Sequence, residues 1–178
     1  MNVVFETDRL LLREFTLNDA RILFELNGDP EVTRYTGDPM KDLDLARQVL
    51  EEVILPQYIL YNYGRWAVHL KQSLAFIGWC GLKFRPWAGI GKVYDHEIDL
   101  GYRFKRSEWG KGYATESAWA CIKYGFEKKE LTRIIGRAMP ENLASLKVLK
   151  NCGMSYVGEG LVDGHQAITY EIFNPLIR

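Results

Sequence analysis

Cysteine and histidine are scarce in this sequence and poorly placed for a disulfide framework or a metal centre. Three cysteines, Cys80, Cys121 and Cys152, and three histidines, at positions 69, 96 and 165, are spread over 178 residues. An odd number of widely spaced cysteines is typical of reduced thiols that pack as small hydrophobic residues. None of these side chains shares a metal-ligand spacing with another. We therefore expect free, buried thiols and no bound metal.

An excess of charge of one sign and a long hydrophobic run are also absent. The 23 basic and 23 acidic residues cancel, so the overall charge gives no attraction to nucleic acid or to an anionic membrane. Glu6, Asp8 and Arg9 occupy the place where a secretory signal needs apolar residues. No run approaches the roughly 20 apolar residues of a membrane span. We expect a soluble, cytoplasmic protein with neither nucleic acid nor membrane as a partner.

What the sequence does contain is enough apolar material for one globular unit. Its hydrophobic residues make up 47% of the chain, which suffices for a sizeable core at this length. No repeat, low-complexity tract or linker interrupts it. We predict one domain over residues 1–178.

The predicted domain begins with a strand at residues 9–15, RLLLREF, an apolar run with charges at its ends.

Helical patterns follow this strand. Thr16 is a suitable N-cap, with Asp19 as a partial capping box, for a helix at residues 19–27. A second helix begins near Lys41. Pro56 should kink or break it, because proline lacks the N–H that the helix ladder requires, and Gly64 should end it.

Beyond residue 65 the period changes to two, which predicts a three-stranded antiparallel meander up to residue 104, with KQS and the glycine-rich WAGIG as turns. The predicted order is β-α-α-β-β-β-α-β-α-β-β, an α+β fold with a mixed, mostly antiparallel central sheet flanked by helices. The last elements are a helix at 113–128, a strand at 132–139, a helix at 143–151 that Asn142 caps and Gly153 ends, and strands at 154–162 and 165–173.

The segment from Arg106 to Glu116, RSEWGKGYATE, joins the meander to the helix after it. Gly110 and Gly112 allow backbone angles and close approaches that side chains would block. A helix that begins there directs unpaired N–H groups and the positive end of its dipole outward. The segment therefore predicts an anion site. On spacing alone, a tight strand-to-helix turn explains the glycines equally well.

Two nucleotide-binding motifs fit this segment poorly. A dinucleotide fingerprint requires glycine or alanine at Thr115 and a parallel βαβ unit, whereas the preceding strand closes an antiparallel meander. A P-loop requires serine or threonine after its lysine, but Lys111 is followed by Gly112. Neither motif is predicted.

The segment resembles the Arg-x-x-Gly-x-Gly/Ala loop of the GNAT superfamily of N-acetyltransferases, from Arg106 through Gly110 and Gly112 to Ala114. Its continuation is most similar to the branch that acetylates the amino termini of ribosomal proteins. The opening ETDRLLLREFTLNDA resembles the start of that branch. Later motifs resemble its Asn-x-x-Ser and Leu-Gly-Phe segments, namely Asn142-x-x-Ser145 and Asn-Cys-Gly-Met at 151–154. The resemblance thus covers nearly the whole chain.

This resemblance implies acetyl-CoA as cosubstrate and no metal. The strand that ends at Phe104 would lie beside the pantetheine arm and exchange backbone hydrogen bonds with it. Backbone N–H groups near Tyr102 to Phe104 would stabilise the oxyanion. The glycine loop would hold the pyrophosphate, with Arg106, Lys111 and the Thr115 hydroxyl adding to it. The implied cofactor contacts are Tyr102, Arg103, Phe104, Arg106, Trp109, Gly110, Lys111, Gly112, Tyr113, Ala114, Thr115, Asn142 and Ser145.

Candidates for acid and base follow from the same resemblance. Glu97 and Asp99 share one face of a strand, and Asp99 lies where the family often has glutamate. Either is a candidate base, directly or through water, and either could instead be a salt-bridged strand residue. The tyrosine that many members use as acid is replaced by Leu149. Ser145 is the ribosomal-type substitute, although a first-turn helix serine can also simply bond backbone.

The expected reaction is acetyl transfer to a primary amine, most like the amino terminus of a protein. A polyamine and an aminoglycoside-like amine are alternatives that keep the same cofactor site. A non-catalytic acyl-CoA sensor is a further alternative, since the usual tyrosine is missing. Both monomer and homodimer are compatible with the sequence. Aromatic candidates for an acceptor pocket are Tyr35, Trp66, Trp79 and Trp87.

Overall fold

The computed structural model describes residues 2–86 and 96–175. The glycine-rich WAGIG segment, Trp87 and the start of the predicted third meander strand lie outside these ranges. Within them, the strands form one eight-stranded sheet with the order β1-β2-β3-β4-β5-β6-β8-β7. The strands are β1 (Val3–Glu6), β2 (Leu10–Glu14), β3 (Arg65–Leu70), β4 (Phe76–Arg85), β5 (Glu97–Phe104), β6 (Arg133–Ala138), β7 (Ser155–Val162) and β8 (His165–Phe173).

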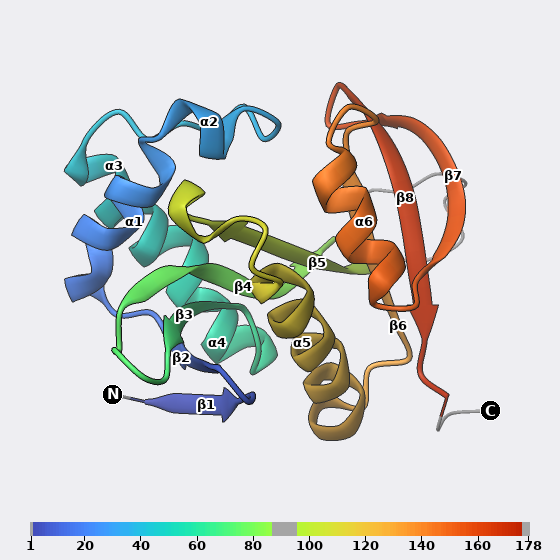
Figure 1. Ribbon diagram of the computed structural model, residues 1–178, viewed down its shortest axis with the longest axis horizontal. Coiled ribbons are helices and arrows are strands. Elements are labelled where there is room, and N and C mark those ends of the chain that lie inside the picture. The colour runs from blue at the N-terminus through green and yellow to red at the C-terminus, as the bar shows by residue number, and fades with distance from the viewer. Residues whose placement is uncertain (1, 87–95, 176–178) are drawn as a thin grey trace.

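The pairing confirms the mixed, mostly antiparallel sheet predicted from the sequence. β3, β4 and β5 form the expected antiparallel meander, and β7 and β8 pair as the final hairpin. The parallel contact is between β5 and β6, where Asp99 lies opposite Ile135 and Leu100 opposite Gly136. In Figure 1 β5 and β6 lie between the two halves of the molecule, with α6, β7 and β8 beyond them. The parallel β5–β6 contact thus joins two antiparallel parts of the sheet.

Helices cover both faces of the sheet and form two apolar clusters. One cluster joins α5 and α6 to β2–β6 around Trp66, Leu82 and Ile134. The other packs α1 and α3 against Ala67, Phe76 and Trp79 on the opposite face. Figure 1 shows α1 to α4 gathered at one end and α6 at the other. The described α-helices are α1 (Ala20–Asn27), α2 (Pro30–Thr33), α3 (Leu43–Val49), α4 (Leu55–Tyr61), α5 (Tyr113–Lys129) and α6 (Leu143–Asn151).

The second predicted helix differs most from expectation. It is divided into α3 and α4 by a π-helical segment, Leu50–Ile54, and Pro56 lies in the first turn of α4. The Leu55 N–H donates to Leu50 O in the wider π-helical ladder, and Pro56, which has no N–H to donate, lies directly after this change in the hydrogen-bond pattern. The helix ends at Asn62, which has a left-handed φ of 59°, so the prediction that Gly64 ends it is wrong. Asparagine is one of the few residues that adopt this conformation readily.

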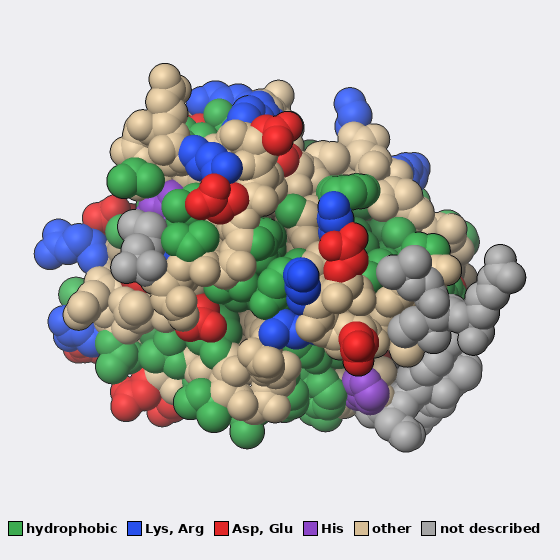
Figure 2. All heavy atoms as spheres, turned by 90° about the horizontal axis from the view of Figure 1, so that it is seen from below, with side chains coloured by type: hydrophobic (Ala, Val, Ile, Leu, Met, Phe, Trp, Pro, Cys, Tyr) green, Lys and Arg blue, Asp and Glu red, His purple; other side chains and the backbone are tan. Residues whose placement is uncertain are grey.

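Further elements were missed because their sequence signals are weak. The edge strand β1 and the one-turn helix α2 are too short to show a period. The start of α1 follows the prediction: the Thr16 N–H donates to the Asp19 carboxylate at 2.7 Å. Within the described ranges, no helix is long and apolar enough to cross a membrane. Figure 2 shows acidic and basic side chains interspersed with hydrophobic ones on one face, as the balanced composition predicts.

Candidate active site

A slot opens between β5 and β6, because their pairing stops at Leu100 while β5 continues to Phe104. On its other edge β5 stays paired with β4 throughout, from Arg85–Glu97 to Gly78–Phe104. The edge that faces the slot therefore carries backbone groups with no strand beside them. Such an edge can receive an extended ligand as an added strand.

Alternation along β5 decides which backbone groups face the slot. The Lys105 N–H donates to Ile77 O at 2.9 Å, on the β4 side. Every second residue of a strand directs its N–H to the same side, so Arg103 also faces β4, whereas Tyr102 and Phe104 face the slot. Phe104 O accepts a hydrogen bond from the Trp109 indole at 2.8 Å. The predicted backbone contact of Arg103 with the cofactor is thus not supported, while the N–H of Tyr102 is available to a ligand.

The glycine loop has the conformation that its sequence predicts. Gly110 and Gly112 have left-handed φ angles of 75° and 83°, and a Cβ built at Gly110 would meet nothing within 4 Å. Helix α5 begins at Tyr113, and the Glu116 N–H donates to Gly112 O at 3.0 Å. The N–H groups of residues 113–115 precede this first helical bond. The loop and helix start therefore fit an anion such as a pyrophosphate.

The start of α5 is held by the N-terminal segment. Arg9 donates through Nε to Glu116 Oε2 at 2.6 Å and through Nη1 to Lys111 O at 3.0 Å. Its guanidinium also lies 4.6 Å from the centre of the Tyr113 ring. Thr7 adds a hydroxyl bond to Glu116. Arg9 and Thr7 are positioning residues that the sequence reasoning missed, because their partners are more than 100 positions away.

The two basic residues of the glycine loop, Arg106 and Lys111, differ in their partners. Arg106 is exposed, whereas Lys111 forms an ion pair with Glu108, with Nζ 3.0 Å from Oε2. This pair lowers the pKa of Glu108 through its hydrogen bond to Lys111. An approaching pyrophosphate would compete with Glu108 for Lys111. The anion site thus depends on backbone N–H groups more than on lysine charge.

Helix α6 brings Ser145 to the slot. Asn142 caps the helix by accepting the Ser145 N–H at 3.1 Å, as its sequence position predicts. The Tyr102 hydroxyl lies 2.8 Å from Ser145 Oγ and 3.0 Å from Ser145 O. Burial raises the pKa of Tyr102 above its usual range. Tyr102 and Ser145 thus form a hydroxyl pair between β5 and α6, which the sequence alone did not link.

Leu149, which replaces the usual acid tyrosine, packs away from the slot. It is 1% exposed, and a Cβ at Gly136 would lie only 2.5 Å from its Cδ2 atom. The side chain therefore fills the space above a glycine of β6. A tyrosine at this position would not fit without displacing that packing.

A cavity of about 500 Å³ lies beside the slot and is open to solvent. It is bounded by α1, the segment after α2, the π-helical segment, and strands β3 to β6. This volume is in the usual range for sites that bind small molecules or chain ends. Tyr35 and Trp79 line it, whereas Trp66 is buried in the core. Charged residues in the lining are Asp38, Arg65, Lys83, Arg85, Asp99, Arg103 and Arg137.

Both candidate carboxylates are held in ion pairs. Glu97 lies 2.5 Å from Arg137 Nη2 and 3.8 Å from Arg133 Nη1, and it does not line the cavity. Asp99 does line the cavity and binds Lys83 Nζ at 2.8 Å. They share one face of β5, as predicted. Glu97 is therefore a buried salt-bridge residue, and Asp99 keeps access to an acceptor.

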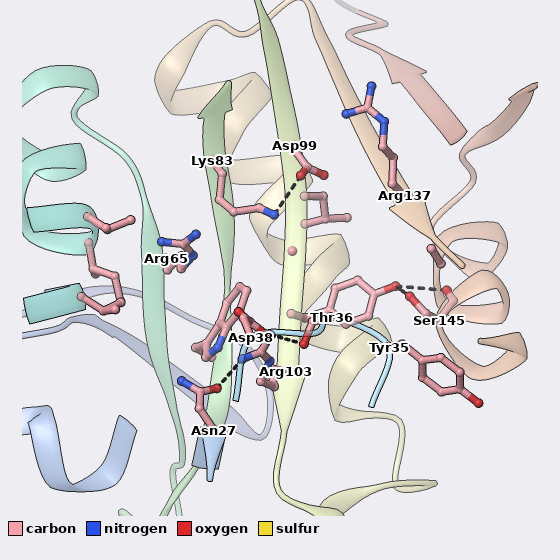
Figure 3. A pocket seen from close by; sticks show the side chains of 18 of the residues that line it. Asn27, Tyr35, Thr36, Asp38, Arg65, Lys83, Asp99, Arg103, Arg137 and Ser145 are labelled. Atoms are coloured by element: carbon pink, nitrogen blue, oxygen red, sulfur yellow. Dashed lines mark hydrogen bonds and ion pairs between the residues drawn. The ribbon is translucent and has the colours of Figure 1, made fainter. Parts of the chain in front are cut away.

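The side chain of Arg103 belongs to the cavity rather than to the cofactor loop. Its guanidinium donates to Asn27, to Thr36 Oγ1 at 2.7 Å and to Asp38 at 2.8 Å. These bonds connect β5 to α1 and to the segment after α2 (Figure 3). Arg103 thus closes one wall of the cavity.

The cysteines are free and buried, as predicted. Cys80 and Cys121 touch across β4 and α5, with their sulfurs 3.5 Å apart. Burial raises the pKa of Cys152 to about 12, so this thiol is protonated and unreactive at neutral pH. All three act as small hydrophobic residues in the first cluster.

An Acetyltransferase (GNAT) domain model matches residues 9–155, which include the splayed strands, the glycine loop and α6. The chain belongs to the GNAT acetyltransferase family. As a GNAT domain it is an acetyl-CoA-dependent N-acetyltransferase, which confirms the predicted fold class and the predicted acetyl transfer from acetyl-CoA.

The proteins similar to this GNAT domain include one sequence relative and two solved structures of the same fold whose named acceptors differ. The uncharacterised N-acetyltransferase p20 of Bacillus licheniformis is 33% identical over 164 residues, 90% of this chain and 85% of that protein. A ribosomal-protein-S5-alanine acetyltransferase from Vibrio fischeri has a similar fold, with a TM-score of 0.74 and 21% identity over 96% of each chain. The spermidine N-acetyltransferase of Vibrio cholerae, solved with CoA and spermine, has a TM-score of 0.73 and 19% identity, covering 94% of this chain and 97% of that one.

Proposed function

We propose that this GNAT domain acetylates the amino terminus of a peptide or protein. The charge of the acceptor cavity is the observation that supports this proposal. Its lining holds five basic residues and two carboxylates, Asp38 and Asp99. A polyamine carries several positive charges and would be repelled by such a lining. A peptide terminus carries one ionisable amine, and the open cavity accommodates the residues that follow it.

In this proposal the acetyl thioester lies in the slot beside β5. The Tyr102 N–H points to that edge and stabilises the negative charge that develops on the carbonyl oxygen as the amine attacks. Phe104 O is already bonded to Trp109, which fixes the end of the strand. The glycine loop and the start of α5 hold the pyrophosphate through backbone N–H groups.

Ser145 and Tyr102 act on the departing thiolate. When the carbon–sulfur bond breaks, the sulfur takes both electrons and needs a hydrogen-bond donor. The Ser145 hydroxyl donates to it, and Tyr102 orients that hydroxyl from 2.8 Å. Neither hydroxyl is acidic enough to give up its proton for long, so solvent supplies the proton finally bound to sulfur.

The attacking amine must first lose a proton, since an ammonium has no lone pair. Asp99 is our candidate base because it lines the cavity, whereas Glu97 is engaged by two arginines. Its ion pair with Lys83 favours a relay through a water molecule over direct contact. Asp99→Asn should then lower kcat/KM most at low pH, where unprotonated amine is scarce.

A panel of amines with acetyl-CoA tests the proposal. We would measure CoA release with short peptides, spermidine and an aminoglycoside, and confirm acetylation of the peptide terminus by mass spectrometry. The proposal requires a kcat/KM for peptides at least tenfold above that for spermidine. Preference for the polyamine would contradict it. Acetyl-CoA binding without CoA release from any amine would instead indicate a sensor.

A further inference from the structure

The acceptor cavity contains a basic residue without an opposite charge beside it. Four of its five basic residues form ion pairs: Lys83 with Asp99, Arg103 with Asp38, Arg85 with Asp163 and Arg137 with Glu97. For Arg65, no ion pair or side-chain hydrogen bond is formed with any residue in the described ranges. Arg65 thus has no ion pair of its own among the described residues, and Asp99 and Asp38 attract it only from a greater distance.

Arg65 is held in place by aromatic packing. Its guanidinium lies 5.5 Å from the centre of the Trp79 ring, and Arg103 lies 5.8 Å from the same ring. A guanidinium stacked on an aromatic ring keeps its N–H groups free in the ring plane for another partner. Burial, and next the positive charge of Arg103, lower the pKa of Arg65, and the carboxylates of Asp99 and Asp38 offset this only in part. A positive charge in this setting is stabilised by an incoming anion.

The position of Arg65 relates it to the reacting end of the acceptor. Arg65 lies opposite Gly81 on β4, and Gly81 lies opposite Gly101 on β5. Two strand spacings, together about 10 Å, therefore separate the backbone of Arg65 from the edge of the slot. In Figure 3 the Arg65 side chain points into the cavity, on the same side of β5 as Lys83. A Cβ at Gly101 would lie 2.9 Å from Lys83 Cε and 3.1 Å from the Trp79 ring, so these two side chains cover the glycine between Arg65 and the slot.

We propose that Arg65 binds an anionic group of the acceptor, a carboxylate or phosphate several bonds away from the amine that is acetylated. This inference rests on the proposed function: for a peptide, the anion is an acidic side chain at the first or second residue. A planar guanidinium recognises carboxylate and phosphate through two parallel hydrogen bonds. Lys83 lies on the same face, where its ion pair with Asp99 neutralises its charge.

Matched acceptors test the inference. We would compare peptides that differ by Glu or Gln at the second residue, and phosphoethanolamine with ethanolamine, by CoA release. The expected result is a KM for the anionic member at least tenfold lower, with a similar kcat. Arg65→Met should remove this difference, and Arg65→Lys should restore part of it. A higher kcat/KM for the Glu-containing peptide than for phosphoethanolamine would identify a chain terminus, rather than a small anionic amine, as the acceptor.

Arg47→Met is the matched control, because Arg47 is 60% exposed on α3 and pairs with Asp44 away from the cavity. It should leave the KM ratio unchanged. For each variant, thermal stabilisation by acetyl-CoA would confirm the fold and the cofactor site. Peptide acetylation without an anionic preference would overturn the inference and leave the proposed function. Arg65-dependent acetylation of phosphoethanolamine, with no acetylation of peptides, would support the anion site and contradict the proposed peptide acceptor. Equal effects of Arg65→Met on both members of each pair would also overturn it.

Discussion

At the scale of single residues, the proposed chemistry depends on the hydroxyls of Tyr102 and Ser145, which contact each other between β5 and α6. Tyr102 has one proton and two oxygen neighbours on Ser145, its carbonyl at 3.0 Å and its hydroxyl at 2.8 Å. When Tyr102 donates to the carbonyl, the Ser145 proton is drawn to Tyr102. When Tyr102 donates to the Ser145 hydroxyl, the serine proton is free to point to sulfur. The direction of the Tyr102 hydroxyl therefore decides whether the Ser145 proton is available to the thiolate.

Ser145→Ala should lower kcat by roughly 10- to 100-fold, because a donor to the thiolate is lost in the transition state. The KM for acetyl-CoA should change little. Tyr102→Phe should lower kcat less, since serine remains. Steady-state kinetics of both single variants and the double variant measure the coupling. Additive effects would show that the hydroxyls act independently.

The loop glycine can be tested in the same way. Gly112→Val places a β-branched residue at a φ of 83° and puts its Cβ 3.4 Å from Arg9 Nη2. We expect acetyl-CoA binding, measured by calorimetry, to be lost. Gly164→Val is the control, because Gly164 has a similar φ of 80° in the turn between β7 and β8. It should cost a comparable 1–2 kcal/mol or so of stability but leave binding intact.

At the scale of elements, buried ion pairs connect helices to the sheet. Arg13 of β2 binds Asp19 at the start of α1 with two bonds of 2.7 Å, and both side chains are about nine-tenths buried. Burial alone would raise the pKa of Asp19, but hydrogen bonds from Arg13 and Thr16 outweigh it and lower that pKa below 3.8. The folded carboxylate therefore holds its charge more firmly than the unfolded one.

The Arg13–Asp19 pair makes the free energy of unfolding depend on pH. A lowered folded pKa contributes stability that is present above pH 3.8, the unfolded value, and is lost as the pH falls through the folded pKa. Asp19→Asn should thus cost about 3 kcal/mol at pH 7 by leaving Arg13 buried without its partner, and less near pH 3. Urea unfolding at both pH values measures this. Asp44→Asn, in an exposed pair, should change stability by under about 1 kcal/mol at either pH.

At the scale of the whole molecule, the cofactor should stabilise both halves together. The glycine loop follows β5, whereas Asn142 and Ser145 belong to α6 beyond β6, so a ligand in the slot contacts elements on both sides of the splay. Acetyl-CoA at 100 times its Kd should add about 2.7 kcal/mol. For a chain of this size that raises Tm by roughly 5–10 °C.

Thermal denaturation with acetyl-CoA, NAD and ATP in parallel measures this effect. Acetyl-CoA should raise Tm, and the two nucleotides should raise it less, because the loop lacks the features of a dinucleotide or P-loop site. The Gly112→Val variant should lose the shift. A shift with NAD or ATP but none with acetyl-CoA would contradict the cofactor site described above.

Local signals in the sequence determined much of the fold. The period of two over residues 65–104, the Asn142 cap and Gly153, with its φ of 76°, place strands and a helix correctly because neighbouring residues alone create these preferences. The glycine loop is likewise a local feature, in which Gly110 and Gly112 must adopt positive φ before a helix begins. Resemblance along the chain then identified the family.

The acceptor side was decided by tertiary structure alone. Asp99 and Lys83 pair across strands, Glu97 meets Arg137 from β6, and Arg103 meets Asp38 from a segment 65 positions away. Sequence spacing cannot show which charges neutralise each other, because electrostatic attraction depends on distance in space. The Tyr102–Ser145 pair and the position of Arg65 beside Trp79 likewise depend on contacts between distant strands and helices. The sequence by itself determined the fold class and the conformation of the glycine loop; which side chains share the cavity depended on how the sheet brings distant strands together.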